Sequence, residues 1–272
     1  PEQVSTITIN RRQGGKKMSQ VIYKKEDNIA VISIDRPEAL NALSRDIVDE
    51  IDKIIDEIQK DSDIRCVVLH SDKNFAAGAD IKGMAECNEE EAKVFSFTPT
   101  FNKIEKLPLP VIAAIEGYAL GGGMEFALTA DIRIAGRTAK MGFPEVTLGI
   151  FPGAGGTIRA PRICGEAFAK ELIFTGDAVS ADRALQMGLV NQVVEEGETL
   201  TAAMKMAGRI ARRGPVAIRM VKDVVTRGIQ EPDMEKAIDI ETKAWPKLFN
   251  TEDQKEGMRA FIEKRKPVYK NK

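Results

Sequence analysis

Residues 110–135 read PVIAAIEGYALGGGMEFALTADIRIA, a glycine-rich segment between two apolar runs. It starts with an apolar, β-branched run that is typical of a buried strand, and it ends with DIRIA, which predicts a second strand. Between these runs, three consecutive glycines precede a glutamate and an apolar segment. Glycine weakens helices and strands alike, so three in a row indicate a place where the backbone lies unusually close to another group.

Spacing alone leaves two interpretations of the three glycines open. A strand that ends at Gly117 and a helix that begins near Gly122 would leave the first N–H groups of the helix unpaired, and the helix dipole would strengthen their attraction for negative charge. A ligand oxygen could then approach within about 3 Å, as in half of an oxyanion hole. Alternatively, the glycines only let a helix and a strand pack closely. A nucleotide-phosphate loop is disfavoured, because neither GGGMEF nor GAGGTIR matches GxGxxG or GxxxxGK[ST].

Strands and helices alternate on both sides of this stretch. The runs IAVISID (29–35) and RCVVLH (65–70) predict further strands, and Ser44 is a suitable N-cap for a helix whose isoleucines and valine recur three or four residues apart. Such alternation predicts an α/β core with right-handed crossovers. After about Gly165, helical patterns follow one another, with one strand candidate among them, NQVVEE. The helices expected there cover 180–188, 200–213, 215–229, 233–245 and a segment from Thr251, where Gln254 completes a capping-box pattern.

The composition limits the classes of function. The 272 residues are 43% hydrophobic and 30% charged with a formal net charge of −1, which is ordinary for a globular protein and gives no general attraction to nucleic acid or an anionic membrane. No run of eighteen apolar residues exists, so we expect no transmembrane helix. Three cysteines without CxxC spacing and one histidine, His70, argue against a disulfide framework, a zinc site and a Ser-His-Asp triad. We therefore expect a cytoplasmic protein without a bound metal.

The N-terminal segment PEQVSTITINRRQGGKK (1–17) precedes Met18, which reads well as a start. The segment is basic but lacks the apolar core of a signal peptide. We interpret it as an N-terminal extension or a cloning remnant.

Two glutamates lie in apolar surroundings. Glu125 falls in the first turn of the helix expected after the glycines, where it could simply complement the helix dipole. Glu145 lies in KMGFPEVTLGIFPGAGG (140–156), a segment rich in apolar residues. A carboxylate in such surroundings is costly unless it is paired or functional. Since the chain offers no usable histidine, an acid/base pair of glutamates is the leading chemical hypothesis.

Five motifs in a fixed order resemble the crotonase, or enoyl-CoA hydratase/isomerase, superfamily. They are DRPEALNALS (35–44), FAAGADIKGM (75–84), the stretch 110–135, GFPEVTLGIFPGAGGTIR (142–159) and AFIEKRKPVYK (260–270). Alone, the turn AAGAD would be no more than a tight turn of small residues. The ordered set is far more specific than any one motif, and the resemblance extends from about Met18 to the C-terminus.

The resemblance implies a crotonase-like spiral core of ββα turns and a helical C-terminal region that mediates trimerisation, often as a dimer of trimers. We accordingly divide the chain into a spiral core for acyl-CoA binding and catalysis (18–200) and a helical C-terminal region (201–272). The implied partners are an acyl-CoA thioester and further copies of the chain in a homotrimer or homohexamer. Because the acyl-CoA is itself the substrate, no separate cofactor is expected, and neither is a nucleic acid or a membrane.

The resemblance also implies roles for single residues. Ala79 and Gly122 match the positions whose backbone N–H groups hold the thioester oxygen. Glu125 and Glu145 match the two glutamates of hydratases, with Glu145 exchanging a proton at the α-carbon and Glu125 acting on water. The CoA-binding positions are Ala39, Leu40, Ala77, Asp80, Ile81 and Lys82, with Phe261 and Lys264 reaching the CoA of a neighbouring subunit. The acyl pocket is expected from Met84, Phe143 and Phe151, and Phe95, Phe97 and Phe101 are expected to line or cover the acyl chain.

The sequence departs from the familiar hydratase pattern at Phe143, where GQPE is common and GFPE occurs here. This change predicts a narrower or flatter acyl pocket and affects substrate choice more than reaction type. The presence of both glutamates favours hydration of a 2-enoyl-CoA. Two alternatives remain open: an isomerase that converts 3-enoyl-CoA to 2-enoyl-CoA on the same scaffold and, more remotely, an RNA-binding protein.

Overall fold

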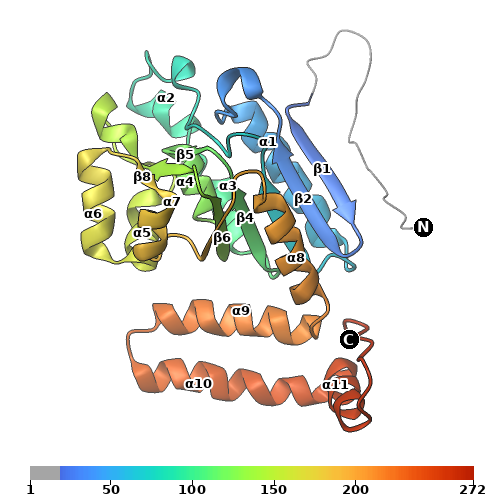
Figure 1. Cartoon of the computed structure of the whole chain (residues 1–272). Helices are drawn as coiled ribbons and strands as arrows, with labels where there is room; N and C mark the ends of the chain where they lie inside the picture. The colour runs from blue at the N-terminus through green and yellow to red at the C-terminus, as the bar shows by residue number, and fades with distance from the viewer. Residues whose placement is uncertain (1–18) are drawn as a thin grey trace.

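The computed structural model describes residues 19–272, so the interpretation of residues 1–17 lies outside the described residues. Its main sheet has six strands in the order β1-β2-β3-β4-β6-β9 (Figure 1). β1 is antiparallel to β2, and every other neighbouring pair is parallel. The strands are β1 (Val21–Glu26), β2 (Ile29–Ile34), β3 (Cys66–His70), β4 (Val111–Ile115), β6 (Ile132–Gly136) and β9 (Gln192–Val194). The predicted alternation of strands and helices is confirmed.

A second, smaller sheet contains β5 (Tyr118–Leu120), β7 (Lys140–Gly142) and β8 (Val179–Ser180). The prediction of one strand ending at Gly117 is therefore wrong, since β4 ends at Ile115 and β5 starts a new sheet three residues later. Gly117 has a φ of +52°, a conformation that L side chains rarely adopt, and it turns the chain from one sheet into the other. This turn brings the three glycines to the end of β5.

Both faces of the main sheet are covered. On one face lies α1 (Arg45–Lys60), whose cap Ser44 accepts a hydrogen bond from the Ile47 N–H at 3.4 Å. The six apolar residues that predicted this helix are all buried, which confirms it. On the other face lies α8 (Thr199–Ala211), whose Ala203 and Ala207 pack on the sheet. This double cover explains why every residue of β3 and β4 is buried.

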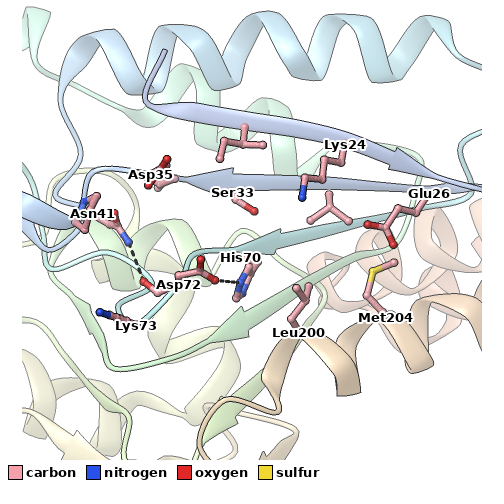
Figure 2. A pocket seen from close by; sticks show the side chains of 14 residues that line it. Lys24, Glu26, Ser33, Asp35, Asn41, His70, Asp72, Lys73, Leu200 and Met204 are labelled. Carbon is pink, nitrogen blue, oxygen red and sulfur yellow. Dashed lines mark hydrogen bonds and ion pairs between the residues drawn. The ribbon is translucent and has the colours of Figure 1, made fainter. Parts of the chain in front are cut away.

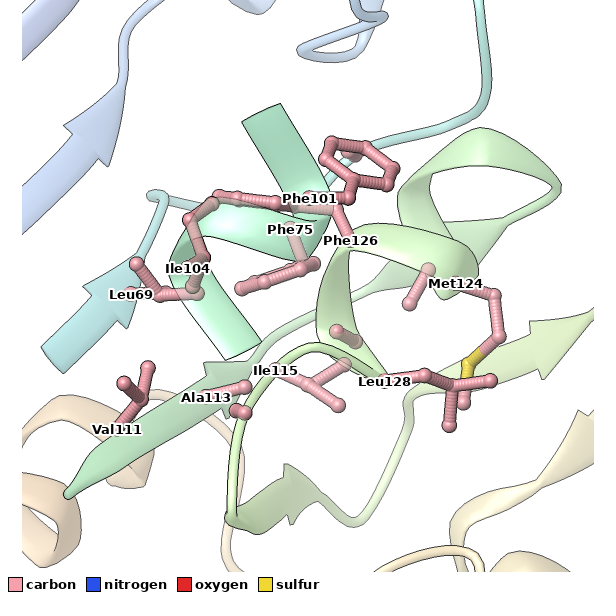
Figure 3. Close-up of a cluster of buried hydrophobic side chains, with 14 of the residues drawn as sticks. Leu69, Phe75, Phe101, Ile104, Val111, Ala113, Ile115, Met124, Phe126 and Leu128 are labelled. Atoms are coloured by element: carbon pink, nitrogen blue, oxygen red, sulfur yellow. The ribbon is translucent and has the colours of Figure 1, made fainter. Parts of the chain in front are cut away.

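An aromatic cluster anchors the segment that follows the glycines. The ring of Phe126 lies between those of Phe75 and Phe101, with centroid distances of 5.5 and 5.6 Å (Figure 3). Phe126 belongs to the short helix α4 (Gly122–Ala127), and Phe101 belongs to α3 (Thr98–Glu105). The residue before Phe126 is Glu125, so this packing fixes the helix that carries the first candidate carboxylate.

The C-terminal helices α9 (Pro215–Gln230), α10 (Met234–Ala244) and α11 (Glu252–Ile262) form a separate layer beyond α8 (Figure 1). All three confirm the predicted helical patterns. The capping box at α11 forms only in part: Thr251 accepts from the Gln254 N–H at 3.0 Å, but the Gln254 side chain turns to the Met258 sulfur instead of returning to the cap. The division at 200/201 falls inside α8, a helix that packs on the sheet.

The other helices connect these layers. They are η1 (Pro37–Ala39), η2 (Ile81–Gly83), α2 (Glu89–Val94), η3 (Pro144–Leu148), α5 (Gly156–Cys164), α6 (Glu166–Thr175), α7 (Ala181–Gln186) and η4 (Trp245–Asn250).

Candidate active site

A cavity of about 470 Å³ lies where α4, η3 and the loops before η2, α3 and α5 meet. Its wall is mostly apolar, with two carboxylates among the lining residues. The residues that carry the chemistry are Ala79, Gly122, Glu125 and Glu145; Met84, Phe95, Phe97, Leu148, Ile150 and Phe151 supply large apolar side chains. An apolar cavity with a few converging polar groups is the usual form of a small-molecule site.

The three glycines before Glu125 differ in what an added side chain would contact. A Cβ added to Gly123 would lie 2.0 Å from the Ala76 carbonyl oxygen, so this residue lets helix and loop pack closely. At Gly121, φ is +50° and a Cβ would lie 2.9 Å from Glu145 Oε1. At Gly122 an added Cβ would meet no clash, since its nearest atom, the Ala79 nitrogen at 3.6 Å, is at an ordinary contact distance. Close packing therefore explains Gly123, and the anion-binding interpretation stays a prediction for Gly122.

Two backbone N–H groups face the cavity side by side. Gly122 is the first residue of α4, where an N–H has no partner within the helix. In the bridge between Leu43 and Ala79, the N–H groups of Leu43 and Asp80 make the two hydrogen bonds, both of 2.8 Å. The N–H of Ala79 lies between them and so points to the opposite side. Within residues 19–272 neither the Ala79 nor the Gly122 N–H has an acceptor, and together they can bind one oxygen atom.

Glu125 is buried in the first turn of α4, as predicted, but it does more than complement the helix dipole. Its Oε1 accepts hydrogen bonds from the backbone N–H groups of Ala154 and Gly156, both at 2.7 Å. Burial raises the pKa of Glu125, while the two N–H groups and the Arg159 cation act in the opposite direction. One carboxylate oxygen is thus fixed, and the group keeps support for its charged form.

Glu145 lies in η3 and has a different environment. Burial raises its pKa to about 7, and the neighbouring charge of Glu125 adds to the shift. Its Oε2 is buried and has no hydrogen-bond partner among the described residues. A carboxyl group with a pKa near neutrality can both hold and release a proton under ordinary conditions.

The residues expected to bind CoA form one wall beside the cavity. The Ala77 N–H donates to the Leu40 carbonyl at 3.1 Å, which joins the segment at Ala39 and Leu40 to the segment 77–82. The Asp80 carboxylate accepts from Arg36 Nη2 at 3.0 Å, and this hydrogen bond holds the pKa of Asp80 below its usual range. Ile81 and Lys82 are exposed at the start of η2. Sequence reasoning had not given Arg36 a role.

The expected acyl-pocket residues separate into two groups. Met84 and Phe151 line the cavity, and so do Phe95 and Phe97. Phe143 is fully buried behind it, with its ring against Gly156, whose added Cβ would lie 2.9 Å from Phe143 Cε1. Phe101 is likewise buried in the aromatic cluster. Phe143 therefore supports the wall from behind instead of facing the cavity.

Phe261 and Lys264 lie on and just after α11, in the C-terminal layer, and neither lines the cavity of its own chain. Phe261 is 86% exposed. The resemblance assigns these residues to the CoA site of a neighbouring subunit, and that role stays a prediction.

A second cavity, of about 380 Å³, lies on the outer face of the sheet beside α8 (Figure 2). Its side chains carry mixed charge, among them Lys24, Glu26 and Asp35. His70 ends β3, as predicted, and its Nε2 lies 3.1 Å from the Asp72 carboxylate. In this cavity the charges are dispersed and the Asp72 partner of His70 is 97% exposed, whereas the cavity at Glu125 has two carboxylates in a mostly apolar wall and is the stronger candidate.

Within residues 19–272, no group of three or more histidine, cysteine, aspartate or glutamate side chains is placed to hold a metal ion. None of the helices in this part of the chain combines the length and apolar character needed to cross a membrane.

Comparisons with known proteins identify the family of the chain. The family model described as enoyl-CoA hydratase/isomerase matches residues 24–272. The chain is 47% identical to the short-chain-enoyl-CoA hydratase of Clostridium acetobutylicum, over 92% of this chain and 97% of that protein. It is 44% identical to the crotonyl-CoA hydratase of Syntrophomonas wolfei, over 93% and 98%. The crystal structure of an enoyl-CoA hydratase from Bacillus anthracis superposes with a TM-score of 0.90 at 40% identity, covering 93% of this chain and all of that one. The chain therefore belongs to the enoyl-CoA hydratase/isomerase family.

Proposed function

We propose that the protein adds water to a short-chain 2-enoyl-CoA to give a 3-hydroxyacyl-CoA, and catalyses the reverse dehydration. The observation that carries this proposal is that one cavity contains two carboxylates in different environments and two free N–H groups. The relatives named for enoyl-CoA and crotonyl-CoA hydration support the same reaction.

The N–H groups of Ala79 and Gly122 would bind the thioester oxygen. As water adds, the electron pair of the C2=C3 bond moves toward the carbonyl and the thioester becomes an enolate. Donors already aimed at that oxygen stabilise the developing charge without having to reorganise. This explains why the middle glycine faces the cavity and lacks a side chain.

The two glutamates would divide the proton transfers. Glu125, whose Oε1 is held by two N–H groups, takes a proton from water through its other oxygen as the water oxygen bonds to C3. Glu145, with a pKa of about 7, is in part protonated near neutral pH and delivers its proton to C2. Dehydration reverses both steps. The different environments match the base and the acid that hydration needs.

The wall formed by segments 39–40 and 77–82 would hold the CoA moiety, and its ion pair between Arg36 and Asp80 would fix the wall's shape. Phe261 and Lys264 would complete the CoA site in a homotrimer or homohexamer, because they lie outside the cavity of their own chain. We expect the cytoplasm as the location, since the three cysteines are free thiols.

A panel of CoA thioesters tests the reaction type. We expect loss of the conjugated enone absorbance with short-chain 2-enoyl-CoA and no turnover of 3-enoyl-CoA at a comparable rate. Activity on 3-enoyl substrates alone would replace the hydratase by the isomerase. Salt-dependent binding of RNA at physiological ionic strength would instead revive the RNA-binding alternative.

A further inference from the structure

Arg159 is a buried arginine whose guanidinium joins three parts of the molecule behind the cavity. It lies in the first turn of α5, and its Nη1 donates to the Ala154 carbonyl at 2.9 Å. Its Nε and Nη2 donate to Glu105 Oε2 at 3.1 and 2.8 Å, and Nη2 also donates to Asn102 Oδ1 at 2.7 Å. The arginine thus ties the loop before α5 to α3.

This loop is the one that holds Glu125. Ala154 uses its carbonyl to accept from Arg159 and its N–H to donate to Glu125, so a single residue connects the two side chains. Between the two N–H donors lies Gly155, with a φ of +106°. A Cβ added there would lie 2.0 Å from Arg159 Nη1, which shows how closely the guanidinium underlies the loop.

The position of Arg159 is unusual for a cation. Positive charge in the first turn of a helix opposes the helix dipole, and a buried guanidinium needs well-placed acceptors to offset the loss of its water. Glu105, which is partly exposed, could have paired with a surface residue instead. Burial of this arginine is therefore best explained by what it does for the loop.

We propose that Arg159 is a positioning residue for Glu125, fixing the loop 154–156 against α3 so that Oε1 stays bound and Oε2 is presented to the attacking water. The inference rests on the proposed hydratase function. The charged groups that face Glu125 are Glu145 from η3 and Arg159 from α5, with Glu105 of α3 beyond the arginine. Loss of the cation removes support for the ionised form of Glu125, so its pKa rises further.

Two substitutions separate position from charge. Arg159→Gln can still donate one hydrogen bond but has no charge, and we expect it to lower kcat about 10- to 100-fold, with KM changed less than about threefold, and to move the acid limb of the kcat/KM profile upward by about 0.5 to 1 pH unit. Arg159→Lys keeps the charge without the planar fork, so we expect a lower kcat with the acid limb near its original place. Arg162→Gln is the matched control, because Arg162 is an exposed arginine on the same helix.

The outcomes are decisive in either direction. A folded Arg159→Gln protein with normal kcat and an unmoved acid limb overturns the inference, even if its Tm falls, because the arginine would then serve stability alone. If that variant is insoluble, Arg159→Lys decides, and a normal kcat there overturns the positioning role. Wild-type protein and Glu125→Gln are measured alongside. If the wild type fails to hydrate 2-enoyl-CoA, the proposed function is wrong. If the wild type hydrates it, Glu125→Gln does not, and the Arg159 variants show normal kcat, only the inference about Arg159 is wrong.

Discussion

Two glycine-rich segments, 121–125 and 153–159, each lead into a helix and leave backbone N–H groups outside the helical hydrogen bonds. The two segments differ in what these N–H groups can bind. In the first, the Gly122 N–H faces the cavity beside Ala79 and is available to a substrate oxygen. In the second, the N–H groups of Ala154 and Gly156 both bind Glu125. The same backbone chemistry fixes a side chain in the second segment and, under the proposed function, would bind a ligand in the first. Arg159 donates a hydrogen bond to the second segment, at the Ala154 carbonyl, and this segment holds the Glu125 carboxylate.

The largest effect on activity is expected from a substitution in the first segment, at Gly122. A methyl group on Gly122 would lie 3.6 Å from the Ala79 nitrogen, at ordinary contact distance from the protein but close to the two N–H groups proposed to bind the thioester oxygen. Gly122→Ala should therefore fold normally and lose about 10²- to 10³-fold in kcat, as when an oxyanion-hole donor is lost. The measurement is steady-state hydration of 2-enoyl-CoA, with the melting temperature as the check on folding.

The neighbouring glycine gives the matched contrast. At Gly123 a Cβ would lie 2.0 Å from the Ala76 carbonyl oxygen, so Gly123→Ala should lower stability by at least about 2 kcal/mol. Denaturant unfolding measures this loss. Equal stability of Gly122→Ala and Gly123→Ala would contradict the assignment of close packing to Gly123 and of ligand binding to Gly122.

A smaller effect is expected in the pH dependence of kcat/KM, and it distinguishes the roles of the two carboxylates. Hydration needs Glu145 protonated, and its pKa is about 7, so kcat/KM for hydration should fall about tenfold per pH unit above that value. Dehydration needs the same number of protons on the pair, with the proton on Glu125 instead of Glu145. Because hydration releases no proton, its equilibrium does not depend on pH, and kcat/KM for dehydration should fall in parallel. Profiles of both directions between pH 5 and 9 check the sign. A flat hydration profile through pH 7 to 9 would contradict the assignment of Glu145 as the acid.

The smallest effect concerns stability. The folded-state pKa of Glu145 lies above its ordinary value of 4.5, so its contribution to stability is present at low pH and is lost as the pH rises through about 7. Glu145→Gln removes the cost of the buried charge, and because solvent screens this half-buried group we expect Tm to rise only about 2–4 °C at pH 8. At pH 4, below the pKa of Glu145 in both the folded and the unfolded chain, the two proteins should melt together. A lower Tm for Glu145→Gln than for the wild type at pH 8 would contradict a destabilising charge on Glu145.

Much of the fold could be predicted from the sequence where the signal is local. The cap at Ser44 and the regular apolar spacing define α1 within one stretch of chain, and the glutamates were recognised because carboxylates in apolar segments need an explanation. The short strands β5, β7 and β8 were missed, because two or three residues carry no periodic pattern and form strands only through pairing. The edge strand β1 was not predicted either. Family membership came from the order of five motifs and not from periodicity.

Part of the site could not be predicted, for a physical reason. The contacts of Glu125 with Ala154 and Gly156 span about thirty residues, and those of Arg159 with Glu105 span 54, so only the folded chain brings them together. GAGGTIR was tested only as a phosphate loop. One available signal was the arginine in the first turn of a helix, where a cation is disfavoured. The burial of Phe143 likewise depends on how η3 packs against α5.

The central claim is that Glu125 and Glu145 act together on one substrate. It is tested most directly by the hydration rate of Glu125→Gln and of Glu145→Gln, each measured at saturating 2-enoyl-CoA with folding verified by circular dichroism. We predict that each substitution lowers turnover at least about 10²-fold, because each removes one of the two proton-transfer groups. If either variant hydrates the substrate at nearly the wild-type rate, the two-carboxylate mechanism is wrong.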